Sequence, residues 1–187
     1  MTIVLIGPPA AGKTRLGKRL ARRLGLPFVD TDAVVVAEHG AISEIFAEHG
    51  EPYFRALERA AVADAVARPG IVSLGGGAVL DPDTQADLAA TRVVLLTVRP
   101  DAIAARIANS KRPLVTDLES WKRLVEARTP LYESLADYTA DTSSRPMDAI
   151  VEEIARWVGD AQSSEGPQST ENAQSTEDPK STEQGES

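Results

Sequence analysis

The sequence predicts an α/β fold, in which a five-stranded parallel sheet carries helices on both faces. Short runs of Val, Ile and Leu alternate along the chain with segments of helical periodicity, which is the pattern of parallel strands joined by crossover helices. The first of these runs is continuously apolar, as expected for a strand buried on both faces. Hydrophobic residues make up 42% of the chain and aromatic residues only 4%, so we expect a mainly aliphatic core.

The first strand carries the strongest strand signal in the chain. Residues Thr2–Ile6 form an apolar, β-branched run that ends at Gly7. Four later apolar segments, bounded by turn residues, are shorter or less regular. We expect these strands at residues 27–29, 71–74, 92–98 and 138–142.

Helical periodicity fills the intervals between the strands. Leu16, Leu20 and Leu24 recur at helical spacing, and Gly25 follows as a C-terminal stop. Asp81 and Pro82 are typical of an N-cap followed by the first helical residue. We expect further helices at 33–39, 43–48, 52–67, 100–108, 121–136 and 147–158, breaks at Gly40 and Gly50, a candidate break at Pro130, a turn at Pro69-Gly70 and a loop over 109–119.

Charge and composition exclude several classes of protein. The formal net charge is −8, which argues against a nucleic-acid binder and against attachment to an anionic membrane surface. There is no cysteine, hence no disulfide, thiolate metal site or cysteine nucleophile. No apolar run approaches the roughly 20 residues that span a bilayer, and no basic segment precedes the first strand as in a signal peptide. We expect a cytoplasmic protein.

The composition changes abruptly near residue 161. Residues 162–187 repeat a six-residue pattern of Gln, Ser, Thr and Glu with no aliphatic or aromatic side chain beyond alanine. Such a segment cannot bury enough apolar surface to offset its ordering entropy, so we expect a disordered tail after a folded domain of residues 1–161. The tail holds six acidic residues and one lysine, a charge of −5, which leaves −3 for the domain. A solubilising linker is our preferred interpretation, and a docking or phosphorylation segment is the alternative.

A phosphate-binding motif follows the first strand. Gly7–Thr14 reads GPPAAGKT and matches G-x-x-x-x-G-K-[ST], between a predicted strand and a predicted helix as the motif requires. Its backbone N–H groups and the helix N-terminus bind phosphates. Lys13 reaches the β- and γ-phosphates, and the Thr14 hydroxyl can ligate Mg²⁺. The following helix is rich in Arg and Lys, which we interpret as a solvated face rather than a nucleic-acid surface.

Two aspartates lie where the second strand ends. Ligands of open α/β sheets bind beyond the carboxyl ends of the strands. On an extended segment, Asp30 and Asp32 point in opposite directions, so we expect different roles. Asp30 could hold Mg²⁺ through water, and Asp32 could take the proton of a substrate hydroxyl. The alternative is that one of them only caps the next helix.

Gly75, Gly76 and Gly77 end the third predicted strand. Three glycines cost backbone entropy and provide no packing. We therefore expect that the absence of side chains lets the backbone approach a ligand closely. A flexible turn is the alternative.

Three arginines stand in positions that suit anion binding. Arg55 lies three residues before Glu58, on the same helical face, so the carboxylate can orient the guanidinium. Arg112 stands in the polar loop, and Arg128 precedes Thr129-Pro130. Beside a P-loop, they suggest clamps on phosphate and on a carboxylate, which arginine binds with two hydrogen bonds.

Taken together, the chain resembles the shikimate kinases. The resemblance extends over about residues 2–158, and the set of motifs is far more specific than the P-loop alone. The matching segments, in the family's order, are Gly7–Thr14, Asp30–Asp32, Gly50–Glu58, Ser73–Ala78, Arg112–Leu114 and Arg128–Tyr132. This resemblance implies the P-loop kinase fold with a lid, and ATP-dependent phosphorylation of the 3-hydroxyl of shikimate in aromatic amino-acid biosynthesis.

The resemblance also implies the roles of single residues. Asp32 would be the base, Arg55 and Arg128 would bind the carboxylate, and the lid residue Arg112 would stabilise the transferring phosphoryl group beside Lys13. Shikimate would contact Asp32, Arg55, Gly75, Gly76, Gly77 and Arg128, with Phe46 and Phe54 lining the pocket. ATP would contact Ala10, Ala11, Gly12, Lys13, Thr14, Arg15, Arg106, Arg112 and Arg145, and Mg²⁺ would lie near Thr14 and Asp30.

The sequence departs from the family in three places. Ala10-Ala11 replaces the more usual Gly-Ser or Gly-Ala pair, the segment between Arg112 and Arg128 is shorter than in many members, and the acidic tail lies outside the family pattern. A kinase of another hydroxy acid such as gluconate is the alternative activity. A nucleoside monophosphate kinase and an ATP-binding module without turnover fit less well. We expect a monomer.

Deletion of the tail tests its separation from the domain. Because disordered termini tolerate truncation, removal of residues 162–187 is expected to leave the phosphorylation rate within about twofold, measured by ADP release. A large loss of turnover would assign the tail a role in catalysis.

Overall fold

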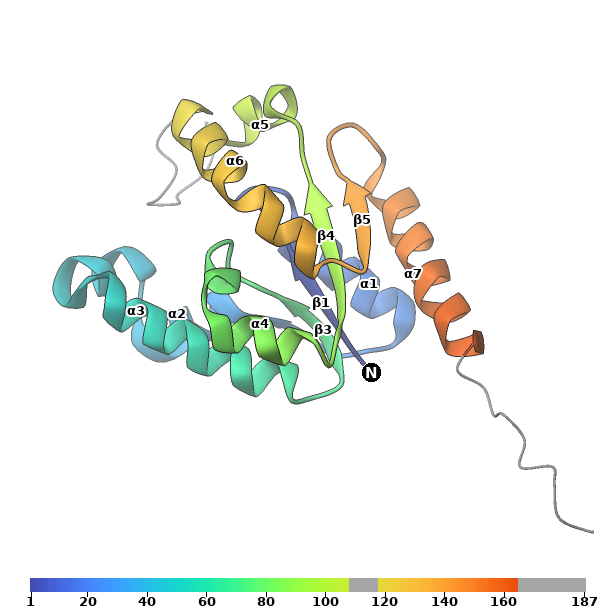
Figure 1. The fold of residues 1–187 in the computed structure, drawn as a ribbon, viewed down its shortest axis with the longest axis horizontal. Coiled ribbons are helices and arrows are strands. Elements are labelled where there is room, and N and C mark those ends of the chain that lie inside the picture. Colours follow the sequence, from blue (N-terminus) through green and yellow to red (C-terminus); the bar gives the residue numbers. More distant parts are fainter. Residues whose placement is uncertain (108–117, 165–187) are drawn as a thin grey trace, which may run out of the picture.

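A computed structural model describes residues 1–107 and 118–164, and the side chains of residues 1–103 and 118–160. The chain alternates strands and helices, as predicted (Figure 1). The strands are β1 (Thr2–Ile6), β2 (Phe28–Asp30), β3 (Gly70–Ser73), β4 (Arg92–Thr97) and β5 (Tyr138–Asp141). The helices are α1 (Lys13–Leu24), α2 (Thr31–His39), α3 (Ile42–Val66), η1 (Ala78–Leu80), α4 (Pro82–Leu88), α5 (Pro100–Ile107), α6 (Leu118–Leu135) and α7 (Met147–Ser164).

The five strands form one parallel sheet in the order β2-β3-β1-β4-β5. Strand β1 is central, between β3 and β4. Because all strands run in the same direction, the loops after β1, β2 and β3 emerge at the same edge, where ligands of open α/β sheets bind. The predicted α/β class and the parallel five-stranded sheet are therefore confirmed.

The core lies on both faces of the sheet, and alternate residues of β1 serve the two sides. Ile3 and Leu5 pack with side chains of α1 and α7, such as Leu16 and Ile150. Val4 and Ile6 pack with α3, α4 and the C-terminal half of α6. The continuous apolar run of β1 is thus explained by burial on both faces, since successive strand residues point to opposite sides.

Helix α6 crosses the carboxyl edge of the sheet. Trp121, near its start, belongs to the core beside α1 and α7, whereas Tyr132, three turns later, belongs to the core on the opposite face. Figure 1 shows α6 running obliquely past the upper end of β4. One helix therefore reaches both the loop after β1 and the loop after β3.

Several predicted boundaries were wrong. Helix α2 begins at Thr31, because Asp30 accepts a hydrogen bond from the Ala33 N–H at 3.2 Å and caps the helix. Asp32 is therefore helical, and the prediction that both aspartates share an extended segment was wrong. Gly70 begins β3 instead of a turn. The predicted break at Gly50 is confirmed, because this residue has φ 80° and ψ 173° and interrupts α3 between its two helical parts.

Helix α6 also differs from its prediction. It begins at Leu118, inside the predicted loop over 109–119, and continues through Pro130. Residues 108–117 of that loop lie outside the described structure. The last helix, predicted to end at Val158, continues to Ser164, because nothing in Gly159–Ser164 stops a helix that the preceding packed turns have already nucleated.

Helix α1 packs so closely on the sheet that a side chain at Gly17 would clash. A Cβ at Gly17 would lie 2.4 Å from the Phe28 ring and 3.0 Å from Leu5. Replacement of an exposed helical glycine by alanine gains up to about 1 kcal/mol. Gly17→Ala is instead expected to lower the free energy of unfolding by about 1–3 kcal/mol, the usual cost of overpacking, as measured by urea denaturation.

Gly159→Ala is the matched control, because this helical glycine has nothing within 4 Å of its Cβ position. That variant is expected to be more stable than the parent by about 0.5–1 kcal/mol. Equal effects of the two substitutions would contradict the close contact between α1 and β2.

Candidate active site

The P-loop is a tight turn between β1 and α1. Gly12 has φ 95° and stands at the N-terminus of α1, where no described side chain caps the first turn. A helix N-terminus of this kind suits an anion, which is the role that the motif predicts for it. Ala10 has φ 64°, a left-handed conformation that costs a residue with a Cβ about 1 kcal/mol more than glycine. The Gly-to-Ala departure seen in the sequence therefore places a strained residue inside the loop.

Contacts from distant elements fix the conformation of this loop. The Lys13 ammonium donates to the carbonyl oxygens of Gly7 at 2.7 Å and Pro8 at 3.0 Å. The Trp121 indole N–H, from α6, donates to the Pro9 carbonyl at 3.0 Å. The Thr142 hydroxyl, after β5, lies 2.9 Å from the Ala11 carbonyl oxygen. Lys13 thus closes the loop on itself, and Trp121 and Thr142 tie it to two distant parts of the chain.

Thr14 and Asp30 lie together beside the P-loop. The Thr14 hydroxyl donates to Asp30 Oδ2 at 2.5 Å, while Asp30 Oδ1 caps α2. The structure therefore brings the two predicted metal-side residues into contact, and it also gives Asp30 the capping role that was the alternative. A hydroxyl and a carboxylate are hard oxygen ligands of the kind that Mg²⁺ prefers.

Arg55 is held in place by two carboxylates. It donates to Glu58 Oε2 at 2.6 Å and to Glu51 Oε1 at 2.9 Å, and its guanidinium lies 5.3 Å from the centre of the Phe54 ring. The predicted i, i+3 pair of Arg55 and Glu58 is confirmed. Glu58 is only 4% exposed. Burial raises the pKa of Glu58, and the neighbouring Arg55 opposes this shift.

The glycine turn after β3 lies directly against these charged side chains. A Cβ at Gly75 would come within 2.6 Å of Asp32 Oδ1 and 2.5 Å of Glu58 Oε1. A Cβ at Gly77 would lie 2.6 Å from Arg55 Nη1, and one at Gly76 would lie 3.2 Å from the Pro9 ring. The three glycines therefore allow close approach of the backbone, as predicted, although here the first groups they approach are protein side chains. They bring Asp32, Glu58 and Arg55 around one turn.

Helix α6 also contacts the glycine turn, through two hydrogen bonds to the Gly76 carbonyl oxygen. Arg128 Nη1 donates to the Gly76 carbonyl at 3.0 Å, and the Tyr132 hydroxyl donates to the same oxygen at 2.5 Å. Burial raises the pKa of the Tyr132 phenol, so its O–H remains a donor at neutral pH. The structure thus places Arg128 at the glycine turn, where its charge also acts on Glu58.

A cavity of about 290 Å³ adjoins this cluster. Its lining includes Arg55, Glu58 and Gly77, together with residues of η1 and α4. Phe46 and Phe54 pack against each other with ring centres 4.9 Å apart, at the edge of a small apolar cluster. Phe54 is buried and reaches the site through its contact with Arg55. Phe46 contacts Phe54, which in turn lies against the Arg55 guanidinium.

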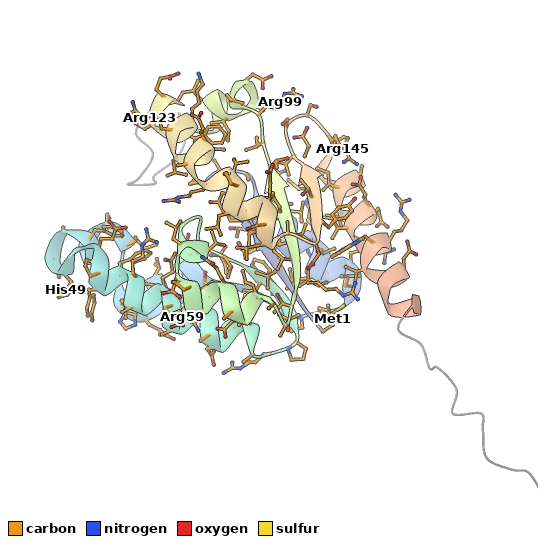
Figure 2. All side chains as sticks on the ribbon, viewed as in Figure 1. Met1, His49, Arg59, Arg99, Arg123 and Arg145 are labelled. Carbon is orange, nitrogen blue, oxygen red and sulfur yellow. The ribbon has the colours of Figure 1, made fainter. Side chains whose placement is uncertain are left out.

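Four arginines were predicted to contact ATP, and the structure describes the side chains of two of them, Arg15 and Arg145. Arg15 is exposed on α1. Arg145 pairs with Glu153 of α7 and lies at the same end of the molecule as Arg99, opposite Met1 (Figure 2). Its neighbour Met147 approaches Gly12, whose Cβ position is 3.7 Å from the Met147 side chain. The side chain of Arg106 and the whole of Arg112 lie outside the described residues.

Sequence reasoning did not assign site roles to four residues that the structure brings to these loops. Glu58 was recognised only as a partner of Arg55, although it also faces Gly75. The contacts of Trp121, Tyr132 and Thr142 to the loops join residues 56 to 131 positions apart. No local pattern predicts such contacts. Tyr132 alone carried a signal, as the last residue of the Arg-x-Pro-Leu-Tyr motif.

Neither a membrane span nor a cluster of metal ligands is present in residues 1–107 and 118–164. No helix in these ranges is both long and apolar enough to cross a bilayer. No group of three or more His, Asp or Glu side chains in the same ranges is arranged to hold a metal ion. A metal at Thr14 and Asp30 would therefore need ligands from phosphates and water, which is how Mg²⁺ is commonly bound.

Comparison with known proteins identifies close relatives. The sequence model of the family described as Shikimate kinase matches residues 9–159. A shikimate kinase of Thermobifida fusca is 47% identical over 158 residues, which are 82% of this chain and 92% of that protein.

Solved structures agree with the sequence comparison. The structure of a shikimate kinase from Acinetobacter baumannii in complex with shikimate has a TM-score of 0.81 and 30% identity, with 86% of this chain and 94% of that one covered. A gluconokinase from Sinorhizobium meliloti has a TM-score of 0.60 at 18% identity, covering 88% and 97%, and shows a likeness of fold alone.

The buried carboxyl group of Glu58 predicts a pH dependence of stability. Because its pKa in the folded protein is raised above the ordinary value of 4.5, the folded state binds this proton more readily than the unfolded chain. The associated stability is fully present below the unfolded pKa and is lost as pH rises through the folded pKa. The Glu58→Gln variant has no ionisable group at this position. The parent's free energy of unfolding, relative to that of the variant, is therefore expected to fall as pH rises from the unfolded to the folded pKa of Glu58.

The measurement is urea denaturation of both proteins at a series of pH values from about 4 to 8, with free energies from linear extrapolation. The difference is expected to level off at high pH. A difference that rises with pH would mean that Arg55, rather than burial, dominates the pKa of Glu58.

Proposed function

The chain belongs to the shikimate kinase family, and we propose that it transfers the γ-phosphoryl group of ATP to the 3-hydroxyl of shikimate through the two loops described above. The observation that carries this proposal is the convergence of a P-loop with Asp32, Arg55 and Arg128 at one edge of the sheet. The products are ADP and shikimate 3-phosphate. Phosphoryl transfer needs mainly correct positioning and stabilisation of charge, which this edge supplies.

The P-loop is the proposed ATP site. Its backbone N–H groups and the first turn of α1 would bind the phosphates. Lys13 now donates to Gly7 and Pro8 carbonyl oxygens, and its ammonium would turn to the β- and γ-phosphates when nucleotide is present. Ala10, Ala11, Gly12, Thr14 and Arg15 complete the predicted nucleotide contacts.

The Thr14–Asp30 pair is the proposed Mg²⁺ side of the site, since its hydroxyl and carboxylate oxygens fit the ion's ligand preference. Bound there, Mg²⁺ would supply positive charge to the phosphate oxygens. The residues' own contribution is to place a hydroxyl and a carboxylate 2.5 Å apart at the start of α1.

Asp32 is the proposed base for the acceptor hydroxyl. Its carboxylate oxygen lies against Gly75, close to the buried carboxyl group of Glu58. Burial raises the pKa of Glu58, and the negative charge of Asp32 adds to that shift. A carboxylate at this position can therefore accept the proton that the hydroxyl loses as the phosphorus–oxygen bond forms.

Arg55 and Arg128 are the proposed carboxylate clamp. Arg55 is oriented by Glu58 and Glu51, and Arg128 is oriented by the Gly76 carbonyl. Both guanidinium groups also act on the buried carboxyl group of Glu58. Two guanidinium groups held at one turn suit a small carboxylic acid, because arginine binds carboxylates with two parallel hydrogen bonds. Phe54, and through it Phe46, would form the apolar wall.

Three further arginines have roles that rest on the resemblance. We propose that Arg112 closes over ATP and stabilises the transferring phosphoryl group, and that Arg106 and Arg145 flank the adenine. The approach of Met147 to Gly12 supports a place for the neighbouring Arg145 near the nucleotide. We further propose a cytoplasmic monomer in which residues 1–161 are the catalytic domain and 162–187 a separate tail.

A coupled assay of ADP release with shikimate, gluconate and AMP as acceptors tests the function. Shikimate is expected to support turnover well above the rate without acceptor, while gluconate and AMP are not. Faster turnover with gluconate would reassign the acceptor, and ADP release with none of the three would contradict the proposed activity.

Arg128→Ala tests the carboxylate clamp. Loss of a hydrogen bond to a charged group costs about 1.5–3 kcal/mol, so the KM for shikimate is expected to rise by about 10- to 100-fold while the KM for ATP changes little. Steady-state kinetics with each substrate varied in turn measures both constants.

Arg123→Ala is the matched control on the same helix. Arg123 is exposed, and its recorded contact is a hydrogen bond to Ser120. Both KM values of this control are expected to stay near those of the parent. A rise in the KM for ATP on replacement of Arg128 would place that arginine on the nucleotide instead.

A further inference from the structure

Helix α6 contacts both substrate-binding loops with side chains from one rigid element. At its start, Trp121 donates to Pro9 of the P-loop. Two turns later, Arg128 donates to Gly76 of the acceptor turn, and Tyr132 donates to the same carbonyl oxygen. The proposed function uses Arg128, but it gives no role to Trp121.

The two loops also touch each other at the residues that α6 holds. A Cβ at Gly76 would lie 3.2 Å from the Pro9 ring, and Pro9 is buried. The position of the Pro9 peptide therefore sets both the shape of the P-loop and its distance from the acceptor turn.

The hydrogen bond to Pro9 has a geometric consequence for the next residue. The Pro9 carbonyl and the Ala10 N–H belong to one planar peptide unit and point in opposite directions. Fixing the carbonyl toward Trp121 therefore fixes the direction of the Ala10 N–H. Thr142 acts similarly two peptides later, because its contact with the Ala11 carbonyl orients the Gly12 N–H.

This orientation matters more here because Ala10 is in the left-handed conformation, with φ 64°. A residue with a Cβ leaves that conformation readily unless its surroundings hold it there. Trp121 holds the peptide bond before Ala10, and Thr142 holds the peptide bond after Ala11. Both side chains are buried, Trp121 being 1% exposed and Thr142 3% exposed, so water does not compete for these bonds.

We propose that Trp121 is a positioning residue for the phosphoryl donor: its indole N–H sets the Pro9–Ala10 peptide plane and thereby the seat of the nucleotide phosphates against the acceptor turn. It acts through the backbone and does not touch either substrate. The inference rests on the proposed function for its catalytic meaning, but the placement of the nucleotide can be measured without turnover.

A structural explanation competes with this one. A buried tryptophan usually finds a hydrogen-bond partner for its N–H, and Trp121 belongs to the core between the sheet and α7. If the bond to Pro9 only satisfies the indole, its loss would reduce stability without altering nucleotide binding.

Trp121→Phe separates the two explanations, since it keeps a buried aromatic ring and removes the donor. Loss of one hydrogen bond that orients a binding loop is expected to weaken ADP binding by about three- to tenfold, measured by titration calorimetry, and to raise the KM for ATP by a similar factor. The KM for shikimate at saturating ATP is expected to stay within about twofold. Unchanged ADP affinity in a folded Trp121→Phe protein would overturn the proposal.

Two controls use the same kind of substitution elsewhere. Trp157→Phe alters the other tryptophan, which lies on α7 and packs against Tyr138 of β5 and Arg92 of β4. This substitution is expected to leave ADP affinity unchanged. Tyr132→Phe removes the donor to Gly76 from the same helix and is expected to raise the KM for shikimate while ADP affinity is retained. Weaker ADP binding in all three variants would indicate general loosening and would overturn the proposal.

The calorimetric result also keeps the two proposals apart. If the parent protein bound ADP but did not phosphorylate shikimate, the proposed function would fail, while a selective loss of ADP affinity in Trp121→Phe would still establish the positioning role.

Discussion

The backbone of the acceptor turn lies directly against the nucleotide-binding loop, and most of the site depends on this contact. Strand β1 pairs with β3 in parallel register, so the P-loop after β1 and the glycine turn after β3 emerge side by side. Pro9 and Gly76 then meet with no room for a relaxed side chain between them. The distance between the two loops is therefore fixed by the sheet rather than by mobile side chains. Phosphoryl transfer between two bound substrates depends on fixed positioning of this kind.

The charges of the site are arranged around the same turn. The chain as a whole is acidic, yet Arg55 and Arg128 both lie at the glycines, each held by acceptors of the protein itself. Holding the guanidinium groups in advance reduces the side-chain entropy that would be lost when a ligand binds. Glu58 interacts with both Arg55 and Asp32, so the charges of these two groups are coupled through one buried carboxyl group.

Local patterns in the sequence identified those parts of the site whose residues are close together in the chain. The P-loop, the Arg55–Glu58 pair and the glycine triplet each occupy a few consecutive positions, so spacing alone indicated their roles. The same reasoning failed for Asp32, because the cap formed by Asp30 starts α2 one residue after the strand. Local rules for strands and helices both fit that segment, and the hydrogen bond to the Ala33 N–H decided between them.

The sequence by itself determined the parallel α/β class, the P-loop and the groups that we propose to bind anions, since these follow from periodicity and from residue type at short spacing. Only the tertiary structure decided which groups meet. It brought α6 across the sheet edge, so that Trp121 reaches Pro9 and Tyr132 reaches Gly76. The physical reason is that such contacts join positions far apart in the chain, and their partners are backbone carbonyls, which every residue type carries and no sequence pattern marks.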